Sequence, residues 1–138
     1  MASPRNPARP LSPHLTAWKP GIHMTVSIVH RITGDGMATV GTLLLVWWLA
    51  ALASGKEAYD KFVDVFTTSN GGLNILGYII GVGLTLSFFQ HMSSGIRHLV
   101  MDAGAGFELK ANRRGAWATV IASVTLTVLY WAYLIMGK

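Results

Sequence analysis

Hydrophobic residues fall into three long blocks that short polar stretches separate. Residues 36–55 form a run of 20 without a charge, and residues 115–137 form another of 23. An α-helix rises about 1.5 Å per residue, so either run can cross a hydrocarbon core of about 30 Å. A third apolar block lies between them, from residue 73 onward. The pattern predicts an all-α membrane protein with three transmembrane helices, at about 22–53, 73–101 and 114–136.

The polar stretches divide the chain further. Residues 54–72 are mildly acidic, and a short amphipathic helix is expected within them at residues 57–66. Residues 1–21 contain all five prolines and are expected to form an N-terminal segment ahead of a membrane domain at 22–138. No apolar segment with a small-residue cleavage site follows them, so neither a signal peptide nor a transit peptide is expected.

Composition narrows the class of protein. Of the 138 residues, 51% are hydrophobic and only 12% are charged, and the length is typical of a single domain. The absence of cysteine excludes disulfides, iron–sulfur clusters and thiolate metal sites in this chain. Basic residues give a net charge of +5 but flank the apolar spans, which favours lipid headgroups over nucleic acid as their counterpart.

The distribution of basic residues predicts the orientation in the membrane. Lys and Arg number four in residues 1–36, two in the first loop and four in residues 97–114, and the first loop also carries three acidic residues. The positive-inside rule therefore places the N-terminus and the second loop on the negative side of the membrane. Three helices bury little surface by themselves, so a partner within the membrane is expected.

His91 lies inside the second apolar block, where an ionisable side chain indicates a functional site. It precedes Arg97 by six residues and so lies about 9 Å deeper than the interface. A haem iron binds a neutral imidazole, and Gly95 would leave room for a flat ligand. Heptad spacing puts Phe88, His91 and Gly95 on one face, which is equally compatible with a packing face. His98 is expected to pair with Asp102.

A second polar group lies near the start of the first helix, in the same leaflet. Ser27, His30 and Arg31 occupy about one turn, with Ser27 and Arg31 four residues apart. His30 and Arg31 are candidate contacts for haem propionates. An arginine at this depth is more often a membrane anchor, and Asp35 lies at the right spacing to pair with it.

Both polar groups fall within motifs that resemble one family, the succinate dehydrogenase cytochrome b subunits. The first motif comprises Arg9–Pro10, Ser27, His30–Arg31 and Thr33–Gly34. The second comprises His91, Gly95, Arg97–His98, Asp102 and Gly104. The resemblance implies a large membrane-anchor subunit of complex II, part of a haem-binding helical bundle shared with a small anchor subunit. Asp35 departs from the family pattern, in which a small or apolar residue is commoner.

The same resemblance implies roles for individual residues and partners. His91 is similar to the axial ligand of the haem b iron, Ser27 and Arg31 to residues lining the ubiquinone pocket, and His30 and Arg31 to propionate contacts. The partners would be a flavoprotein with FAD, an iron–sulfur protein and the small anchor, in a bacterial cytoplasmic membrane. The chain would then be a subunit of a succinate:quinone oxidoreductase, not catalytic alone. A transporter or channel subunit and a haem-free anchor remain open alternatives.

Overall fold

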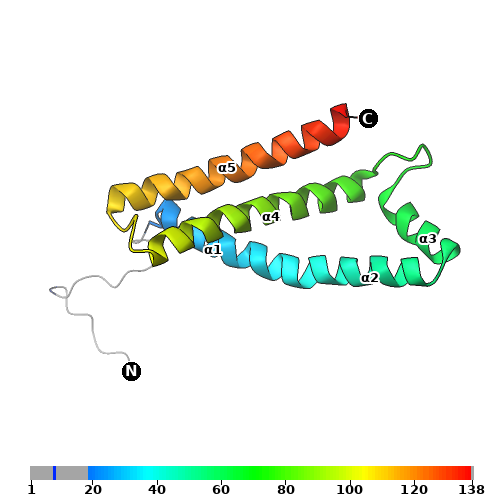
Figure 1. Cartoon of the computed structure of the whole chain (residues 1–138), viewed down its shortest axis with the longest axis horizontal. Coiled ribbons are helices and arrows are strands. Elements are labelled where there is room, and N and C mark those ends of the chain that lie inside the picture. Colours follow the sequence, from blue (N-terminus) through cyan, green and yellow to red (C-terminus); the bar gives the residue numbers. More distant parts are fainter. Residues whose placement is uncertain (1–7, 9–18, 138) are drawn as a thin grey trace, which may run out of the picture.

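A computed structural model describes residue 8 and residues 19–137 of the chain, and its regular elements are helices. They are α1 (Ile22–Gly36), the π-helix η1 (Met37–Gly41), α2 (Thr42–Ala53), α3 (Lys56–Phe66), α4 (Ile75–Asp102) and α5 (Leu109–Met136). The long helices lie lengthwise beside one another, and α3 crosses the end of the bundle between α2 and α4 (Figure 1). The all-α architecture predicted from the sequence is confirmed.

Three helical segments are long and apolar enough to cross a membrane. The first is continuous from Ile22 to Ala53 through η1, and the others are Ile75–Asp102 and Leu109–Met136. The third helix begins at Leu109 rather than near residue 114, because Lys110, Arg113 and Arg114 form its first turns. Lysine and arginine favour helices, so the helix extends beyond its uncharged part. Most of the predicted segment 1–21, including Arg9–Pro10, lies outside the described residues.

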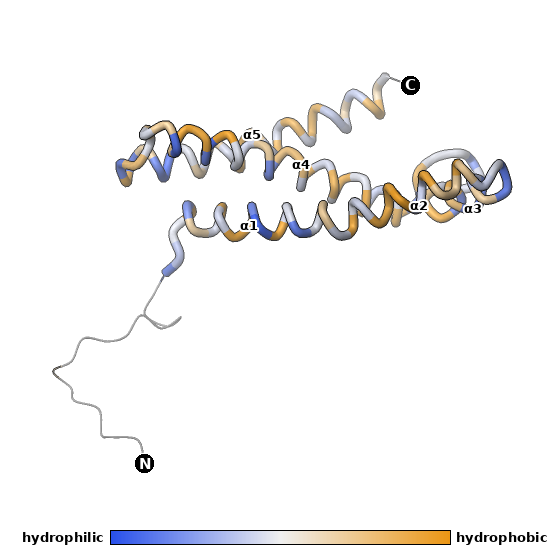
Figure 2. Tube along the Cα trace, turned by 60° about the horizontal axis from the view of Figure 1, so that its bottom comes forward, coloured by the Kyte–Doolittle hydropathy of each residue, from blue (hydrophilic) through white to orange (hydrophobic). Residues whose placement is uncertain are grey.

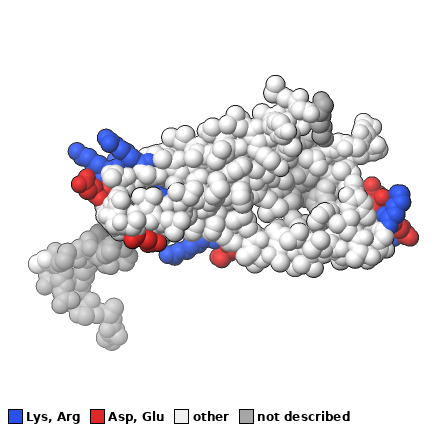
Figure 3. Space-filling view, viewed as in Figure 1, with Lys and Arg blue, Asp and Glu red and all other residues white. Residues whose placement is uncertain are grey.

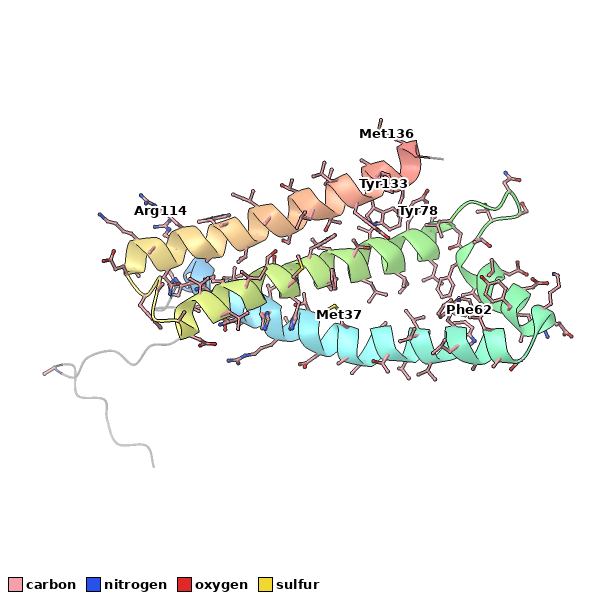
Figure 4. All side chains as sticks on the ribbon, viewed as in Figure 1. Met37, Phe62, Tyr78, Arg114, Tyr133 and Met136 are labelled. Carbon is pink, nitrogen blue, oxygen red and sulfur yellow. The ribbon has the colours of Figure 1, made fainter. Side chains whose placement is uncertain are left out.

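The predicted amphipathic helix of the first loop is α3, at Lys56–Phe66. Its apolar side packs against α2, where the rings of Trp47 and Phe62 lie 4.8 Å apart, edge to face. Phe62 points from α3 toward α2 (Figure 4). The opposite side of α3 carries the ion pairs Lys56–Asp60 and Lys61–Glu57. An amphipathic helix at this end closes the loop between the first two spans.

Little of the apolar surface is buried within the chain itself. Among the described residues, the buried apolar side chains are Val26, Ala51 and Ala116. Many large apolar side chains of the spans are exposed, and Figure 2 shows hydrophobic positions recurring along these helices. On the visible face, charged side chains lie at the two ends and along the lower edge of the left half, and the rest of this face is uncharged (Figure 3). Such a surface needs lipid or other membrane helices around it.

Candidate cofactor site between α1 and α4

Three of the five histidines gather where α1 packs against α4. The rings of His30 and His91 stack with centroids 3.9 Å apart and planes 9° from parallel. His98 meets His30 edge-on, at 5.1 Å between centroids. His91 and His98 are seven residues apart and therefore share one face of α4. The structure thus brings the predicted propionate contact, His30, directly against the predicted haem ligand, His91.

One nitrogen of His91 is engaged by α1. Its Nδ1 lies 3.0 Å from the main-chain carbonyl oxygen of His30 and 3.5 Å from Oγ1 of Thr33. A carbonyl oxygen only accepts hydrogen bonds, so this contact assigns the proton to Nδ1. Nε2 then keeps its lone pair, and no described residue hydrogen-bonds it. This is the state in which an imidazole binds a metal.

Two glycines lie beside the stacked rings. A Cβ atom built on Gly34 would lie only 2.8 Å from Cε1 of His91, whereas one on Gly95 would lie 3.9 Å from Cε1 of His30. Gly34 therefore permits the close approach of the His91 ring to α1. The sequence pattern pointed to Gly95 instead, although Thr33–Gly34 lies within the first motif and was the signal that could have identified Gly34.

The pairs expected along single helices do not form. The ion pairs in the described part of the chain are those of α3, so Arg31 is not paired with Asp35. His98 contacts His30 on the neighbouring helix rather than Asp102 on its own. The two predicted pairs do not form, although the same spacing gives ion pairs in α3, so spacing along one helix does not by itself decide the contact.

Ser27 and Arg31 are present on α1 as predicted, but they make no contact with the histidines through a hydrogen bond. Ser27 is half-buried and Arg31 is exposed. Neither side chain has a hydrogen bond or ion pair with a described residue. Both polar groups are therefore available to a ligand or to another chain.

The Nδ1 atom of His30 is also without a partner, although it is buried. A buried polar atom that lacks a hydrogen bond is costly and suggests a group that completes the site. An acceptor such as a carboxylate would fit a protonated Nδ1.

The opposite face of α4 is closed against α5. Ser123 donates a hydrogen bond from Oγ to Oε1 of Gln90 at 2.6 Å, and Arg97 donates from Nη2 to Oδ1 of Asn112, also at 2.6 Å. A cavity of about 380 Å³ lies on this side, with Arg97 and Asn112 in its wall and no histidine. Gly81 meets Trp131 of α5, and Phe88 is 54% exposed. His91 and Gly95 do share the side of α4 that faces α1, as the heptad spacing predicted.

The histidine cluster suits a haem better than a bare metal ion. No group of three or more His, Cys, Asp or Glu side chains in the described residues is arranged to hold a metal ion. Stacked rings do not direct their nitrogens to one point. A haem brings four nitrogen ligands of its own and needs only axial ligands from protein. One free Nε2 on His91, an unpaired Nδ1 on His30 and an unpaired cation at Arg31 fit that requirement.

Comparison with known proteins gives consistent matches over most of the chain. Residues 5–130 match the succinate dehydrogenase/fumarate reductase transmembrane subunit family. The chain is 39% identical over 123 residues to the succinate dehydrogenase cytochrome b556 subunit of Rickettsia prowazekii, covering 89% of this chain and 90% of that protein. It is 35% identical over 129 residues to the cytochrome b556 subunit of Paracoccus denitrificans, covering 94% of each. The mitochondrial cytochrome b560 subunit of Mus musculus is 35% identical over 122 residues, which are 88% of this chain and 66% of that protein.

Proposed function

Because the chain belongs to the succinate dehydrogenase/fumarate reductase transmembrane subunit family, we propose that it is the membrane-anchor cytochrome b subunit of a succinate:quinone oxidoreductase. In this role it binds haem b and forms one wall of the ubiquinone-reduction site. Electrons reach that site from succinate through the iron–sulfur subunit. The chain contributes binding and positioning, and the complex as a whole is the enzyme.

The proposal rests on how the two ring nitrogens of His91 are hydrogen-bonded. Its Nδ1 is engaged by the carbonyl of His30, and its Nε2 is left without a hydrogen bond. His91 would hold the haem iron through Nε2, and the small anchor subunit would supply a second ligand. When bound, haem b supplies reversible one-electron transfer.

The haem propionates would be held by His30 and Arg31. The buried Nδ1 of His30 lacks a partner, and a propionate oxygen would satisfy it. Arg31 is exposed, lies next to His30 on α1 and has no ion pair with any residue that the structure describes, so its guanidinium can bind a carboxylate in a bidentate manner.

Ser27 and Arg31 are proposed to bind the quinone. They are four residues apart on one helix and so present their polar groups on the same side. A quinone carbonyl gains negative charge as it is reduced, and a hydroxyl donor with a guanidinium stabilises that charge. Because neither side chain has a hydrogen-bond or ion-pair partner among the described residues, neither must break such a bond to do so.

The complex is proposed to lie in the bacterial cytoplasmic membrane, with the N-terminus on the cytoplasmic side. Arg114 projects from the start of α5, at the end of the bundle where α1 begins (Figure 4). The exposed apolar surface supports a small anchor partner, while the flavoprotein with FAD and the iron–sulfur subunit would dock on the cytoplasmic side. A reporter placed after Lys138 should be periplasmic and one near Lys110 cytoplasmic; the reverse pattern would overturn this orientation.

A reduced-minus-oxidised visible spectrum of the purified complex tests the proposal. Succinate should reduce a low-spin b-type band, and the same preparation should reduce ubiquinone. Succinate oxidation by a water-soluble acceptor serves as the control, since that reaction bypasses the membrane subunits. A complex active with that acceptor but lacking the band would be a haem-free anchor, and this part of the proposal would be wrong.

A further inference from the structure

The contacts around His91 come from main chain rather than from a second polar side chain. We propose that the carbonyl of His30 and the bare Cα of Gly34 form a seat for the His91 imidazole. The carbonyl holds Nδ1 and so leaves Nε2 as the nitrogen that can bind the iron. The glycine determines the rotation of the imidazole ring next to α1. This inference rests on the proposed haem ligation and concerns positioning residues, not residues that touch the iron.

The first part of the seat is the hydrogen bond to His30. A histidine ligand is usually oriented by the hydrogen bond of its other nitrogen, which also raises its basicity. Here the acceptor is a carbonyl of α1, 3.0 Å from Nδ1 of His91. Main-chain atoms inside a helix cannot rotate away as a side chain can. The tautomer and the position of Nδ1 are therefore tied to the backbone of α1.

The second part is the space above Gly34. A Cβ there would lie 2.8 Å from Cε1 and 3.2 Å from Nδ1 of His91, closer than ordinary van der Waals contact. The ring cannot simply withdraw, because it is stacked on His30 at 3.9 Å and bonded at Nδ1. Adding a methyl group must therefore break the hydrogen bond, turn the ring or separate α1 from α4.

Thr33 affects the strength of the hydrogen bond between His91 and the carbonyl of His30. Its hydroxyl lies 3.0 Å from the His30 carbonyl and 2.8 Å from the Val29 carbonyl, and it can donate to either. It therefore shares the acceptor that His91 uses. Removing the hydroxyl leaves the His30 carbonyl to His91, which should strengthen that bond and make the imidazole a stronger ligand.

The experiment compares Gly34→Ala with Gly36→Ala in the assembled complex. Alanine favours a helix over glycine by up to about 1 kcal/mol, so both changes share that gain. Only Gly34 faces His91, since a Cβ at Gly36 has nothing within 4 Å. The complex is purified from haem-starved cells and titrated with haemin, and the electron paramagnetic resonance signal of the low-spin ferric haem is recorded.

Gly34→Ala is expected to weaken haemin binding about 10-fold or more and to shift the ferric signal, as changes to ligand-orienting groups typically do. Gly36→Ala should match the unmodified complex in both readouts. Thr33→Val, which keeps the shape of the side chain, should lower the haem reduction potential without loss of haem.

If Gly34→Ala keeps the wild-type affinity for haemin and an unshifted electron paramagnetic resonance signal, the proposed positioning role of Gly34 is wrong. If Gly34→Ala does not assemble, an unchanged potential in Thr33→Val would contradict the proposed seat instead. Absence of haem from the unmodified complex would refute the proposed function rather than this inference, so the two failures are distinguishable.

Discussion

The two faces of α4 carry polar side chains of different kinds. Toward α5, Oε1 of Gln90 accepts a hydrogen bond from Ser123 and Arg97 donates one to Asn112, although Nε2 of Gln90 is buried without a partner among the described residues. Toward α1, His30 and His91 stack, Nδ1 of His91 contacts the His30 carbonyl and the Thr33 hydroxyl, and Nδ1 of His30 is left unpaired by the described residues. Hydrogen bonds between helices hold a membrane bundle together, whereas an ionisable side chain in its interior indicates a functional site. The α5 face therefore contributes hydrogen bonds between the helices, and the α1 face presents histidines that can bind a ligand.

This difference yields an ordered set of tests. Changes on the α1 face should alter cofactor and substrate chemistry and leave assembly intact. Changes on the α5 face should alter stability and leave the haem spectrum intact. A variant that violates this division shows that the two faces are not independent.

The largest effect is expected from His91→Leu. Leucine fills the site without offering a ligand, so the low-spin haem spectrum should disappear or change to that of a differently ligated haem. The visible spectrum of the assembled complex measures this. His98→Leu is the control on the same face of α4 and should do much less, because His98 meets only the edge of His30. A normal spectrum from His91→Leu would remove His91 as the ligand.

Next in size are changes to Ser27 and Arg31. Loss of one hydrogen bond to a developing charge costs about 10²-fold or more in a dry site, and a site near the interface should lose less. Ser27→Ala should slow ubiquinone reduction while the haem content stays normal. Arg31→Lys should fall between the wild type and Arg31→Ala, because lysine keeps the charge but not the planar fork.

Two activities must be followed in these variants. If succinate oxidation by a water-soluble acceptor falls together with quinone reduction, the complex has misassembled. Unaffected quinone turnover in both Ser27→Ala and Arg31→Ala would place the pocket elsewhere.

On the α5 face, Asn112→Ala should destabilise the bundle without affecting the haem. Asn112 accepts the hydrogen bond of the half-buried Arg97. Leaving a charged donor without its acceptor costs about 1–3 kcal/mol, and partial exposure puts this site at the low end. Thermal unfolding of the detergent-solubilised complex measures the loss. A shifted haem spectrum in this variant would contradict the independence of the two faces.

The smallest effect is expected from Ser123→Ala, which removes the donor to Gln90. Side-chain hydrogen bonds between membrane helices average about 0.6 kcal/mol, so a small drop in the unfolding temperature is expected. Ser54→Ala is the matched control, since Ser54 is exposed and bonds only the carbonyl of Ala50 within its own helix. Equal stability of the two variants would mean that the Ser123–Gln90 bond contributes nothing.

The length of uncharged sequence was sufficient to predict the three spans, because crossing a membrane requires a helix of known length. The pattern around residue 57 was sufficient for α3, whose apolar side faces α2. Contacts between helices were harder to predict. His98 was assigned to Asp102 because both lie on one helix, yet its actual neighbour, His30, is 68 positions away in the sequence.

In the candidate site, too, the contacts between helices could be predicted only in part from the sequence. The residue types and their motifs predicted that His30 and His91 belong together, and they do lie in contact. That the contact passes through a main-chain carbonyl depends on how far α1 is rotated toward α4. A glycine anywhere in a helix leaves space for a neighbouring group to come close. The sequence therefore does not distinguish Gly34, which has the His91 ring against it, from Gly36, which has nothing against it.

The π-helix at Met37–Gly41 separates the two halves of the first span. A π-turn holds one residue more than an α-turn, and one residue corresponds to about 100° of rotation. The π-helix therefore changes the direction in which the side chains of α2, including Trp47, point relative to those of α1, including His30. Deleting a single residue there would allow uninterrupted α-helix, and one half would then turn away from its neighbour. The first span therefore consists of two helical segments in different rotational positions: α1 packs against α4 and α5, and α2 packs against α3.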